Sequence, residues 1–175
     1  MKKIFSLFFA MIMMTTFLIG CTTKKEAKTV DLDKIHETVK ETFGEDYAPN
    51  RELTMEEIEN LTGIKEDNIE KIIAESPMIS VNVDTFIGIK AKEGKADIVE
   101  EGLEKYRKYL VEESMQYPMN IAKVNSAKVI RHEDYVFFVM LGKHDDRQEA
   151  TDEERLEFAK EEVKKVEDAI NKFFE

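Results

Sequence analysis

Apolar residues recur every three or four positions along much of this chain, as they do on one face of an α-helix. This spacing predicts helices over residues 31–43, 54–62, 67–76, 95–115 and 151–173. Thr54 and Thr151 each stand three residues before a glutamate, which is the capping-box pattern of a helix start. Gly44 and Gly63 are predicted to end the first two helices.

The last of these helices carries an apolar stripe, spaced three and four residues apart, from Leu156 to Phe173. Such a stripe fits either a coiled-coil seam with a partner or a helix that covers a sheet. A coiled coil needs three or more heptads, and this stripe reaches only about that minimum. We therefore predict that the helix covers a sheet.

Apolar and polar residues alternate from Ile79 to Ala91, which is the period of a β-strand with one buried face. Two shorter strands are predicted over Ala127–Arg131 and Tyr135–Leu141, joined tightly around residues 132–134. The Tyr135–Leu141 strand is apolar on both faces, which predicts a place in the interior of the sheet.

The order strand–helix–strand–strand–helix, preceded by short N-terminal helices, predicts an α+β fold similar to a truncated ferredoxin-like sandwich. In such a fold two helices cover one face of a small, partly antiparallel sheet. The other face would be solvated, covered by the N-terminal helices, or used for binding. Because no repeat or linker is visible after residue 30, residues 31–175 are predicted to form one domain.

The first 21 residues have the layout of a secretory signal peptide: two lysines, an apolar run from Ile4 to Ile19, then Gly20 and Cys21. The apolar run is short for a transmembrane helix, which needs about 20 residues. Leu18, Ile19, Gly20 and Cys21 resemble the lipobox of bacterial lipoproteins. In that family the cysteine sulfur receives a diacylglyceryl group and the peptide is cut before the cysteine.

This resemblance implies a signal peptide at residues 1–20 and a lipidated cysteine with a polar tether at residues 21–30. Two acyl chains hold a protein stably on a membrane, whereas one gives only reversible binding. Lys24, Lys25 and Lys28 would lie beside anionic headgroups and be attracted to them. The predicted location is therefore the extracytoplasmic face of the cell membrane.

Charge and cysteine content exclude several classes of function. The chain carries 26 basic and 37 acidic side chains among its 175 residues, a net charge of −11, and loss of residues 1–20 with their two lysines would make it −13. An acidic domain of this kind is a poor nucleic-acid binder, because phosphate neutralisation needs clustered lysine and arginine. With one cysteine there is no internal disulfide and no cysteine-based zinc site.

Motifs for catalysis or cofactor binding are absent from the sequence. There is no glycine-rich phosphate loop, no Gly-x-Ser-x-Gly elbow and no His-Glu-x-x-His helix, so no cofactor is predicted. Asp84 is the one weak catalytic candidate, because it interrupts an apolar strand and a buried carboxylate is costly. Strand alternation instead favours Asp84 on a solvated face beside Asn82 and Lys90.

Three histidines and an acidic segment are the remaining candidates. His36 lies beside an apolar helix face, so a structural histidine at the core boundary is favoured over a ligand. His132 lies at the predicted hairpin tip, where an exposed polar residue is expected. His144, Asp145 and Asp146 open a segment rich in carboxylates, which makes weak binding of a divalent cation conceivable. The EF-hand spacing fails there, since Arg147 takes a ligand position. A solvated loop is therefore favoured.

The tyrosines and phenylalanines leave a similar choice between ligand binding and core packing. Tyr106, Tyr109, Tyr117, Phe137 and Phe138 could line a ligand groove. Packing in the core accounts for most such aromatic residues and is the favoured interpretation.

Several short motifs occur in an order that is similar to a family of small bacterial lipoproteins known only by a domain of unknown function. The matching pieces are Pro77–Ser80, Lys90–Lys92, Ala96–Leu110, Tyr117–Pro118, Asn125–Ser126 and the strand that starts at Tyr135–Val136. The chain departs at the hairpin, where residues 131–134 replace an Asn-Gly type of turn. The resemblance implies architecture and location, and it brings no activity.

Three hypotheses for function follow. The favoured one is a non-enzymatic binding or assembly module, anchored to the membrane and meeting an envelope protein partner. The second is a carboxylate-based enzyme that acts on an envelope polymer or small ligand, with Asp84 as the only residue nominated for it. The third is a weak divalent-cation site at Asp145–Glu154.

Overall fold

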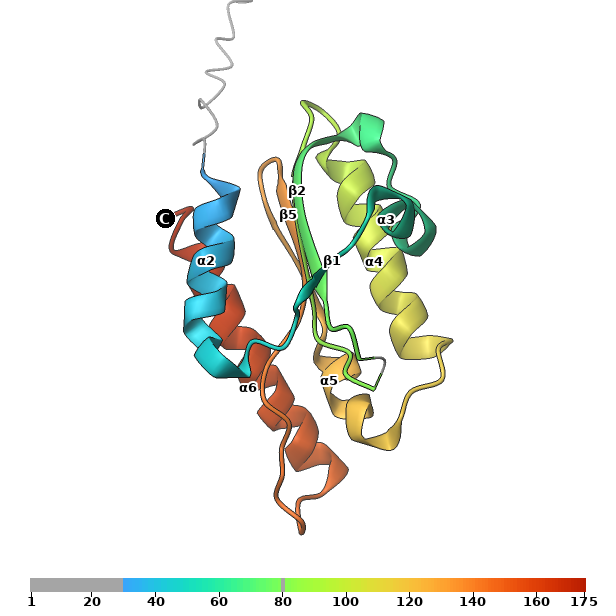
Figure 1. Cartoon of the computed structure of the whole chain (residues 1–175), viewed down its shortest axis with the longest axis vertical. Helices are drawn as coiled ribbons and strands as arrows, with labels where there is room; N and C mark the ends of the chain where they lie inside the picture. The colour runs from blue at the N-terminus through green and yellow to red at the C-terminus, as the bar shows by residue number, and fades with distance from the viewer. Residues whose placement is uncertain (1–29, 80) are drawn as a thin grey trace, which may run out of the picture.

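A computed structural model describes residues 30–79 and 81–175, and it shows an open β-sheet enclosed between two layers of helices (Figure 1). The described residues contain the α-helices α2 (Leu32–Phe43), α3 (Met55–Thr62), α4 (Ala96–Glu112), α5 (Ile121–Ser126) and α6 (Asp152–Asn171). Three short 3-10 turns lie at Gly44–Asp46, Glu66–Asn68 and Pro118–Asn120. The fold is α+β, as predicted.

The sheet is antiparallel throughout the described residues, in the order β1-β2-β3-β5-β4. Its strands are β1 (Arg51–Glu52), β2 (Ile69–Ser76), β3 (Thr85–Ala91), β4 (Lys128–His132) and β5 (Tyr135–Met140). β5 is paired on both sides, by β3 and β4, which confirms the prediction that this apolar run lies inside the sheet. A ferredoxin-like arrangement is not established by this topology.

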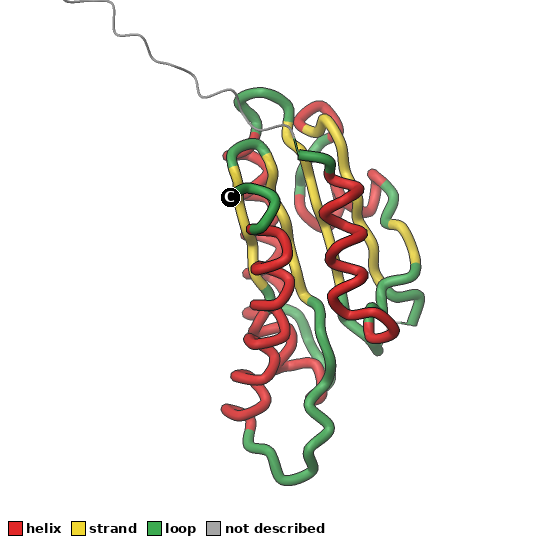
Figure 2. Tube along the Cα trace, turned by 90° about the vertical axis from the view of Figure 1, so that its left-hand side faces the viewer, coloured by secondary structure: helices red, strands yellow, loops and turns green. Residues whose placement is uncertain are grey.

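The two faces of the sheet carry separate hydrophobic cores. On one face, α4 buries Val99 and Leu103 against β3 and β5. On the other, α2 and α6 bury side chains such as Val39 and Val166 against alternate residues of the same strands. Two helices do share one face, but they are α2 and α6: the helices predicted over residues 95–115 and 151–173 correspond to α4 and α6, which lie on opposite faces (Figures 1 and 2).

The helices predicted from apolar spacing are present, apart from the one at residues 67–76. Thr54 and Thr151 form the expected capping boxes, each accepting a hydrogen bond from the backbone of the glutamate three residues on. The covering role predicted for the last helix is confirmed, since Val163, Val166 and Ile170 are buried against the sheet.

Two strand assignments were wrong. Residues 69–76, predicted as a helix, form β2, and the long strand predicted from Ile79 begins only at Thr85. A register shift between Ile69 and Lys71 explains the first error, because a bulge breaks the alternation that marks a strand. Ile79 and Val81 alternate with polar residues but lie exposed in the loop before β3.

The two ends of β5 have different neighbours. Val30, where the described chain begins, lies at the Tyr135 end, and α5 lies near the opposite end. The Tyr135 hydroxyl donates to the Val30 carbonyl oxygen (2.7 Å) and lies 3.1 Å from the Val30 amide nitrogen. From Tyr135 to Gly142 the extended chain spans about 23 Å. Figure 1 accordingly shows the start of α2 and the helix α5 toward opposite ends of the sheet.

Candidate functional site

A buried ion pair joins three segments at the α5 end of the sheet. The pairing of Thr85 with Met140 sets Asp84, just before β3, beside the end of β5. Lys123 of α5 reaches into this corner and donates hydrogen bonds to Asp84 Oδ1 and to the Gly142 carbonyl oxygen, the latter at 2.5 Å. Asp84 and Lys123 are 1% and 3% exposed. Burial raises the pKa of the Asp84 carboxyl, and the Lys123 ammonium partly offsets that rise.

Close packing around Gly142 holds this corner against α6. Gly142 has a φ of +128°, and a Cβ placed on it would overlap Glu162 Cβ. The buried Glu162 carboxylate accepts a hydrogen bond from the Lys143 backbone N–H (3.1 Å) and pairs with Lys165. Glycine is therefore required where the chain leaves β5 and passes α6.

Asn120 ties the same corner to the β2–β3 loop. Its side-chain nitrogen donates to the Val81 carbonyl oxygen (2.9 Å), and the residue is fully buried. Its Oδ1 atom accepts no hydrogen bond from the described residues. Ser126 closes α5 by donating to the Lys123 carbonyl oxygen (2.7 Å). The segment that carries Lys123 is thus fixed at both ends.

An open groove of about 750 Å³ lies outside this corner, between α5 and the first two turns of α6. We call it the α5–α6 groove. Its apolar lining consists of Pro118, Met119, Ile121, Ala122, Leu156, Phe158 and Ala159. Its polar lining consists of Lys123, Asn125, Lys143, His144, Asp145, Asp146, Asp152, Glu153 and Arg155. The size is that of a ligand or peptide site.

The cations that line the groove are all committed to other groups. Lys123 is held by Asp84, and Lys143 pairs with Asp46 (2.9 Å). Arg155 donates to the backbone carbonyl oxygens of Asp145 and Arg147, each at 2.7 Å. The groove therefore presents no free cation within the described part of the chain.

Three acids on the rim are not committed. Asp146, Asp152 and Glu153 form no ion pair with any described residue, although Asp146 lies in the field of Arg147. Asp152 and Glu153 occupy the first turn of α6, where the helix dipole favours negative charge. The rim is thus negative, and its acids are free to meet a cationic ligand.

His144 faces the same groove as a neutral side chain. Burial lowers its pKa, and the Lys123 ammonium lowers it further, while a hydrogen bond to the Met119 backbone acts in the opposite direction. An imidazole whose pKa lies below its ordinary value of 6.5 is uncharged at neutral pH. It therefore adds no positive charge to the groove.

The predicted cation ligands do not converge. Asp145 is held by Arg147 through two hydrogen bonds, from Nε to Oδ1 (2.8 Å) and from Nη2 to Oδ2 (2.6 Å). His144 is turned toward the Met119 backbone instead. Across residues 30–79 and 81–175, no group of three or more histidine, cysteine, aspartate or glutamate side chains is arranged to hold a metal ion.

The Asp145–Arg147 pair gives a direct test of this loop. The hydrogen bonds from Arg147 lower the pKa of Asp145 from 3.8 to about 2. We expect a carboxyl NMR titration of the folded protein to show an Asp145 midpoint near 2, and Arg147→Gln to raise it toward its ordinary value. Because the folded-state pKa is depressed, the pair stabilises the fold above the ordinary pKa, and this contribution is lost as the pH falls toward about 2. An unchanged midpoint in Arg147→Gln would contradict the pairing.

The structure corrects two sequence-based placements. Asp84 does not lie on a solvated face, because helices cover both faces of the sheet and Lys123 neutralises its buried carboxylate. His132 is not an exposed tip residue: it lies at the end of β4, stacks on Phe174 (4.3 Å between centroids) and has its Nε2 2.8 Å from Asn171 Oδ1. Asp84 is also not among the residues that line the groove.

The aromatic residues divide as the core interpretation predicted. Tyr106, Phe137 and Phe138 are buried in the two cores, and none of the five candidates lines the α5–α6 groove. Tyr109 and Tyr117 are exposed. Sequence reasoning missed Lys123 because it lies 39 residues from its partner Asp84. Its helix, α5, is only six residues long and follows Tyr117-Pro118, a helix-breaking pair, so the apolar spacing did not predict it.

A second polar cluster lies away from the groove. His36 Nε2 lies 3.1 Å from both Tyr47 Oη and Glu75 Oε2, and the Tyr47 hydroxyl donates to Glu75 (2.9 Å). Burial and the neighbouring Glu75 carboxylate raise the pKa of Tyr47. His36 is buried and stacks on Phe86, so the structural role predicted for it agrees with its contacts. This cluster joins α2 to β2, and none of its three residues lines the α5–α6 groove.

A known family model covers the sheet and most of its helices. A family model described as "Domain of unknown function (DUF4358)" matches residues 44–141. The chain belongs to the DUF4358 family. The matched range contains β1 to β5 with α3, α4 and α5, so both partners of the buried ion pair lie in the DUF4358 region, while the α6 side of the groove follows it. No curated protein and no solved structure matches the chain.

The predicted lipobox, Leu18 to Cys21, lies outside the residues that the structure describes. Of the helices that are described, none combines the length and the apolar character needed to cross a membrane.

Proposed function

We propose that this DUF4358 protein is a lipoprotein of the cell membrane whose folded domain is a non-enzymatic binding module on the extracytoplasmic face. The anchor would be a diacylglyceryl group on Cys21, exposed after cleavage behind Gly20. The binding site would be the α5–α6 groove. The observation that carries this proposal is a large, mostly apolar groove whose cations are all engaged in structural contacts.

Binding is favoured over catalysis because Asp84, the one residue nominated as catalytic, is buried and paired with Lys123. Lys123 uses two of its three donors on Asp84 and Gly142. Asp84, the acid nominated for an enzyme, sits behind Lys123 and does not reach the groove surface. A general acid or base must come within hydrogen-bond reach of its substrate, so the carboxylate-enzyme hypothesis gains no support from this geometry.

The position of the groove supports presentation to a partner. Val30, the last residue of the proposed tether, is held at the Tyr135 end of β5, whereas the groove lies beyond Gly142. In a domain tethered at Val30, the groove would therefore lie about 23 Å from the point where the tether joins the domain. Such an arrangement suits contact with a protein in the envelope rather than with the anchoring lipid.

Lipidation is tested by comparing the wild-type protein with Cys21→Ala in the native host. We expect the wild-type protein to incorporate labelled palmitate, to fractionate with membranes, and to begin at a modified Cys21 by intact-mass analysis. Cys21→Ala should lose the label and the membrane association, because two acyl chains supply the stable anchor. A wild-type protein that keeps residues 1–20, or that fractionates with the cytosol, would refute the anchor.

The binding module is tested separately by placing a photo-crosslinking amino acid at Phe158, which lines the groove, or at Lys105 on the exposed face of α4 as a matched control. We expect the probe at Phe158 to crosslink a partner in intact membranes and the probe at Lys105 to give no such product. The crosslinked product from Phe158 should be lost when Cys21→Ala is added. Equal products from both positions would show non-specific contact and contradict the groove as the binding site.

A further inference from the structure

The α5–α6 groove combines an apolar floor with a negative rim, and this combination narrows the class of ligand. Leu156 and Ala159 on α6 and Ile121 and Ala122 on α5 all line the groove. Met119 and Ile121 remain 62% and 49% exposed, which leaves apolar surface for a partner to cover. Methionine is adaptable in shape and is frequent at surfaces that bind apolar segments.

From these features we infer that the α5–α6 groove binds a basic amphipathic helix of a partner protein. This inference rests on the proposed binding function and names the chemistry of its ligand. The lining residues of α6 run from Asp152 to Ala159, two turns or about 12 Å of helix. A partner helix of similar length would lay its apolar side chains along this floor, as in other helix-in-groove complexes.

Charge complementarity fixes the sign of the partner. Asp146, Asp152 and Glu153 lack ion-pair partners among the described residues, whereas each lining cation is already paired or hydrogen-bonded. A lysine or arginine beside the apolar face of the partner would form ion pairs with these carboxylates, whereas an acidic partner would be repelled. An anionic membrane surface would be repelled for the same reason.

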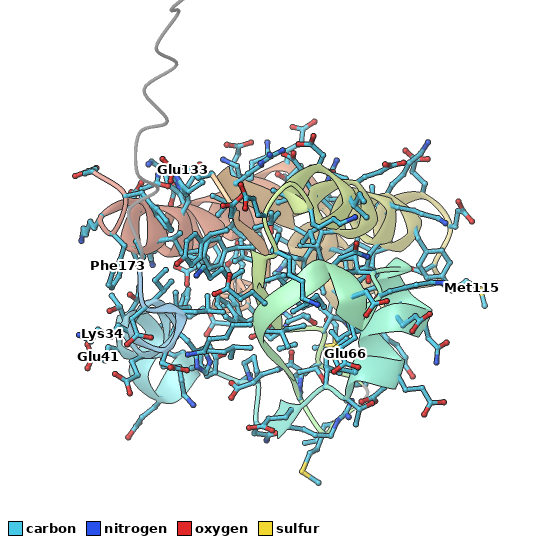
Figure 3. All side chains as sticks on the ribbon, turned by 90° about the horizontal axis from the view of Figure 1, so that it is seen from above. Lys34, Glu41, Glu66, Met115, Glu133 and Phe173 are labelled. Carbon is cyan, nitrogen blue, oxygen red and sulfur yellow. The ribbon has the colours of Figure 1, made fainter. Side chains whose placement is uncertain are left out.

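The apolar surface continues beyond the groove onto the neighbouring loops. Met115 projects from the body at the edge of the molecule (Figure 3), and Tyr117 and Met119 follow it in the same exposed segment. The Asn120 contact with Val81 brings the exposed β2–β3 loop to this segment. A bound helix could therefore extend past the groove over this loop pair.

The probe for this inference is a fluorescent peptide of about 14 residues, built from leucine and lysine at helical spacing. Two matched peptides carry glutamate in place of lysine, or glutamine in place of leucine. We expect the purified full chain to bind the leucine–lysine peptide in an anisotropy titration and to bind each matched peptide at least about tenfold more weakly. Raising NaCl from about 50 to 500 mM should weaken binding, since salt screens exposed charges.

Two sets of variants locate the peptide on the protein. Neutralising the rim with Asp146→Asn, Asp152→Asn and Glu153→Gln should weaken binding about tenfold. Met119→Ser with Ile121→Ser should do the same without touching the fold, because both side chains are exposed. The control neutralises three exposed acids that do not line the groove, Glu37→Gln and Glu41→Gln on α2 and Glu66→Gln before β2, and should leave affinity within about twofold. Figure 3 shows Glu41 on the outer side of α2.

The alternatives give distinct results. Equal weakening in the rim and control variants would show attraction to the acidic body as a whole and overturn the inference. So would equal binding of the glutamate peptide, or binding of phosphatidylcholine vesicles without binding of any peptide. If Phe158 captures a partner in membranes while the leucine–lysine peptide fails to bind, the binding module stands and only the chemistry of its ligand is wrong.

Discussion

Replacing Lys123 with methionine is expected to lower the free energy of unfolding by about 3–5 kcal/mol, because the change leaves the Asp84 carboxylate buried without its cation. Replacing Asp84 with leucine alone should cost a similar amount by stranding the ammonium. The double variant should recover most of the loss, since an apolar pair of similar volume avoids the cost of desolvating two charges. Urea unfolding followed by circular dichroism measures all three, as the chain has no tryptophan.

A surface ion pair supplies the control. Lys71 pairs with Asp33 between β2 and α2, and both side chains are largely solvated. Exposed pairs contribute little to stability, so Lys71→Met should leave the urea midpoint almost unchanged. If Lys123→Met shifts the urea midpoint no more than Lys71→Met does, the buried pair does not hold α5 to the sheet.

The Lys123→Met variant should also depend on pH in a defined direction. Burial raises the pKa of Asp84, and loss of the cation that offsets this effect raises it further. A carboxyl whose folded-state pKa exceeds its unfolded value favours the fold below the unfolded pKa and loses that contribution as the pH rises through the folded value. The deficit relative to wild type should therefore be smaller near pH 4 than near pH 8.

The sequence predicted the elements whose period is regular and whose ends carry a local signal. α3 and α6 begin at threonines that form capping boxes, and α4 keeps its apolar spacing over its whole length. β5 was placed inside the sheet because it is apolar on both faces. In these cases the local pattern and the tertiary environment agree.

The errors have a common physical origin, which is that a local pattern was broken or imitated. The bulge between Ile69 and Lys71 broke the strand period of β2, so that three isoleucines imitated a helix. Ile79 and Val81 imitated a strand in an exposed loop. The alternation argument for Asp84 assumed a solvated face, which the sheet does not have among the described residues.

The candidate site was less predictable than the fold, because its residues are close in space only through the topology. Lys123 meets Asp84 and Gly142 across 39 and 19 residues of chain. The groove likewise joins a six-residue helix to the first turns of α6. Leu156 and Ala159 were assigned to the stripe that covers the sheet, and they instead line the groove where α6 extends beyond the buried part of that stripe.

Gly142 is the position where one methyl group should do the most damage to the site. Gly142→Ala is expected to cost about 2–6 kcal/mol, of which overpacking against Glu162 contributes about 1–3 and the strained backbone about 1–3. The shift needed to relieve this overlap would displace the carbonyl oxygen that accepts from Lys123. The measurement is again urea unfolding.

Two further variants separate the contributions at Gly142. Gly94 also has a positive φ (+73°), but no atom lies within 4 Å of the place that an added methyl group would occupy, so Gly94→Ala should show the backbone cost without the clash. Glu162→Gly removes the Cβ atom that the new methyl group would strike, and the double variant with Gly142→Ala should therefore be more stable than the two single losses would predict. If Gly142→Ala costs no more than Gly94→Ala, the close packing of this turn on α6 is wrong. Contacts other than the packing of Gly142 on Glu162 would then have to hold the carbonyl oxygen that accepts from Lys123.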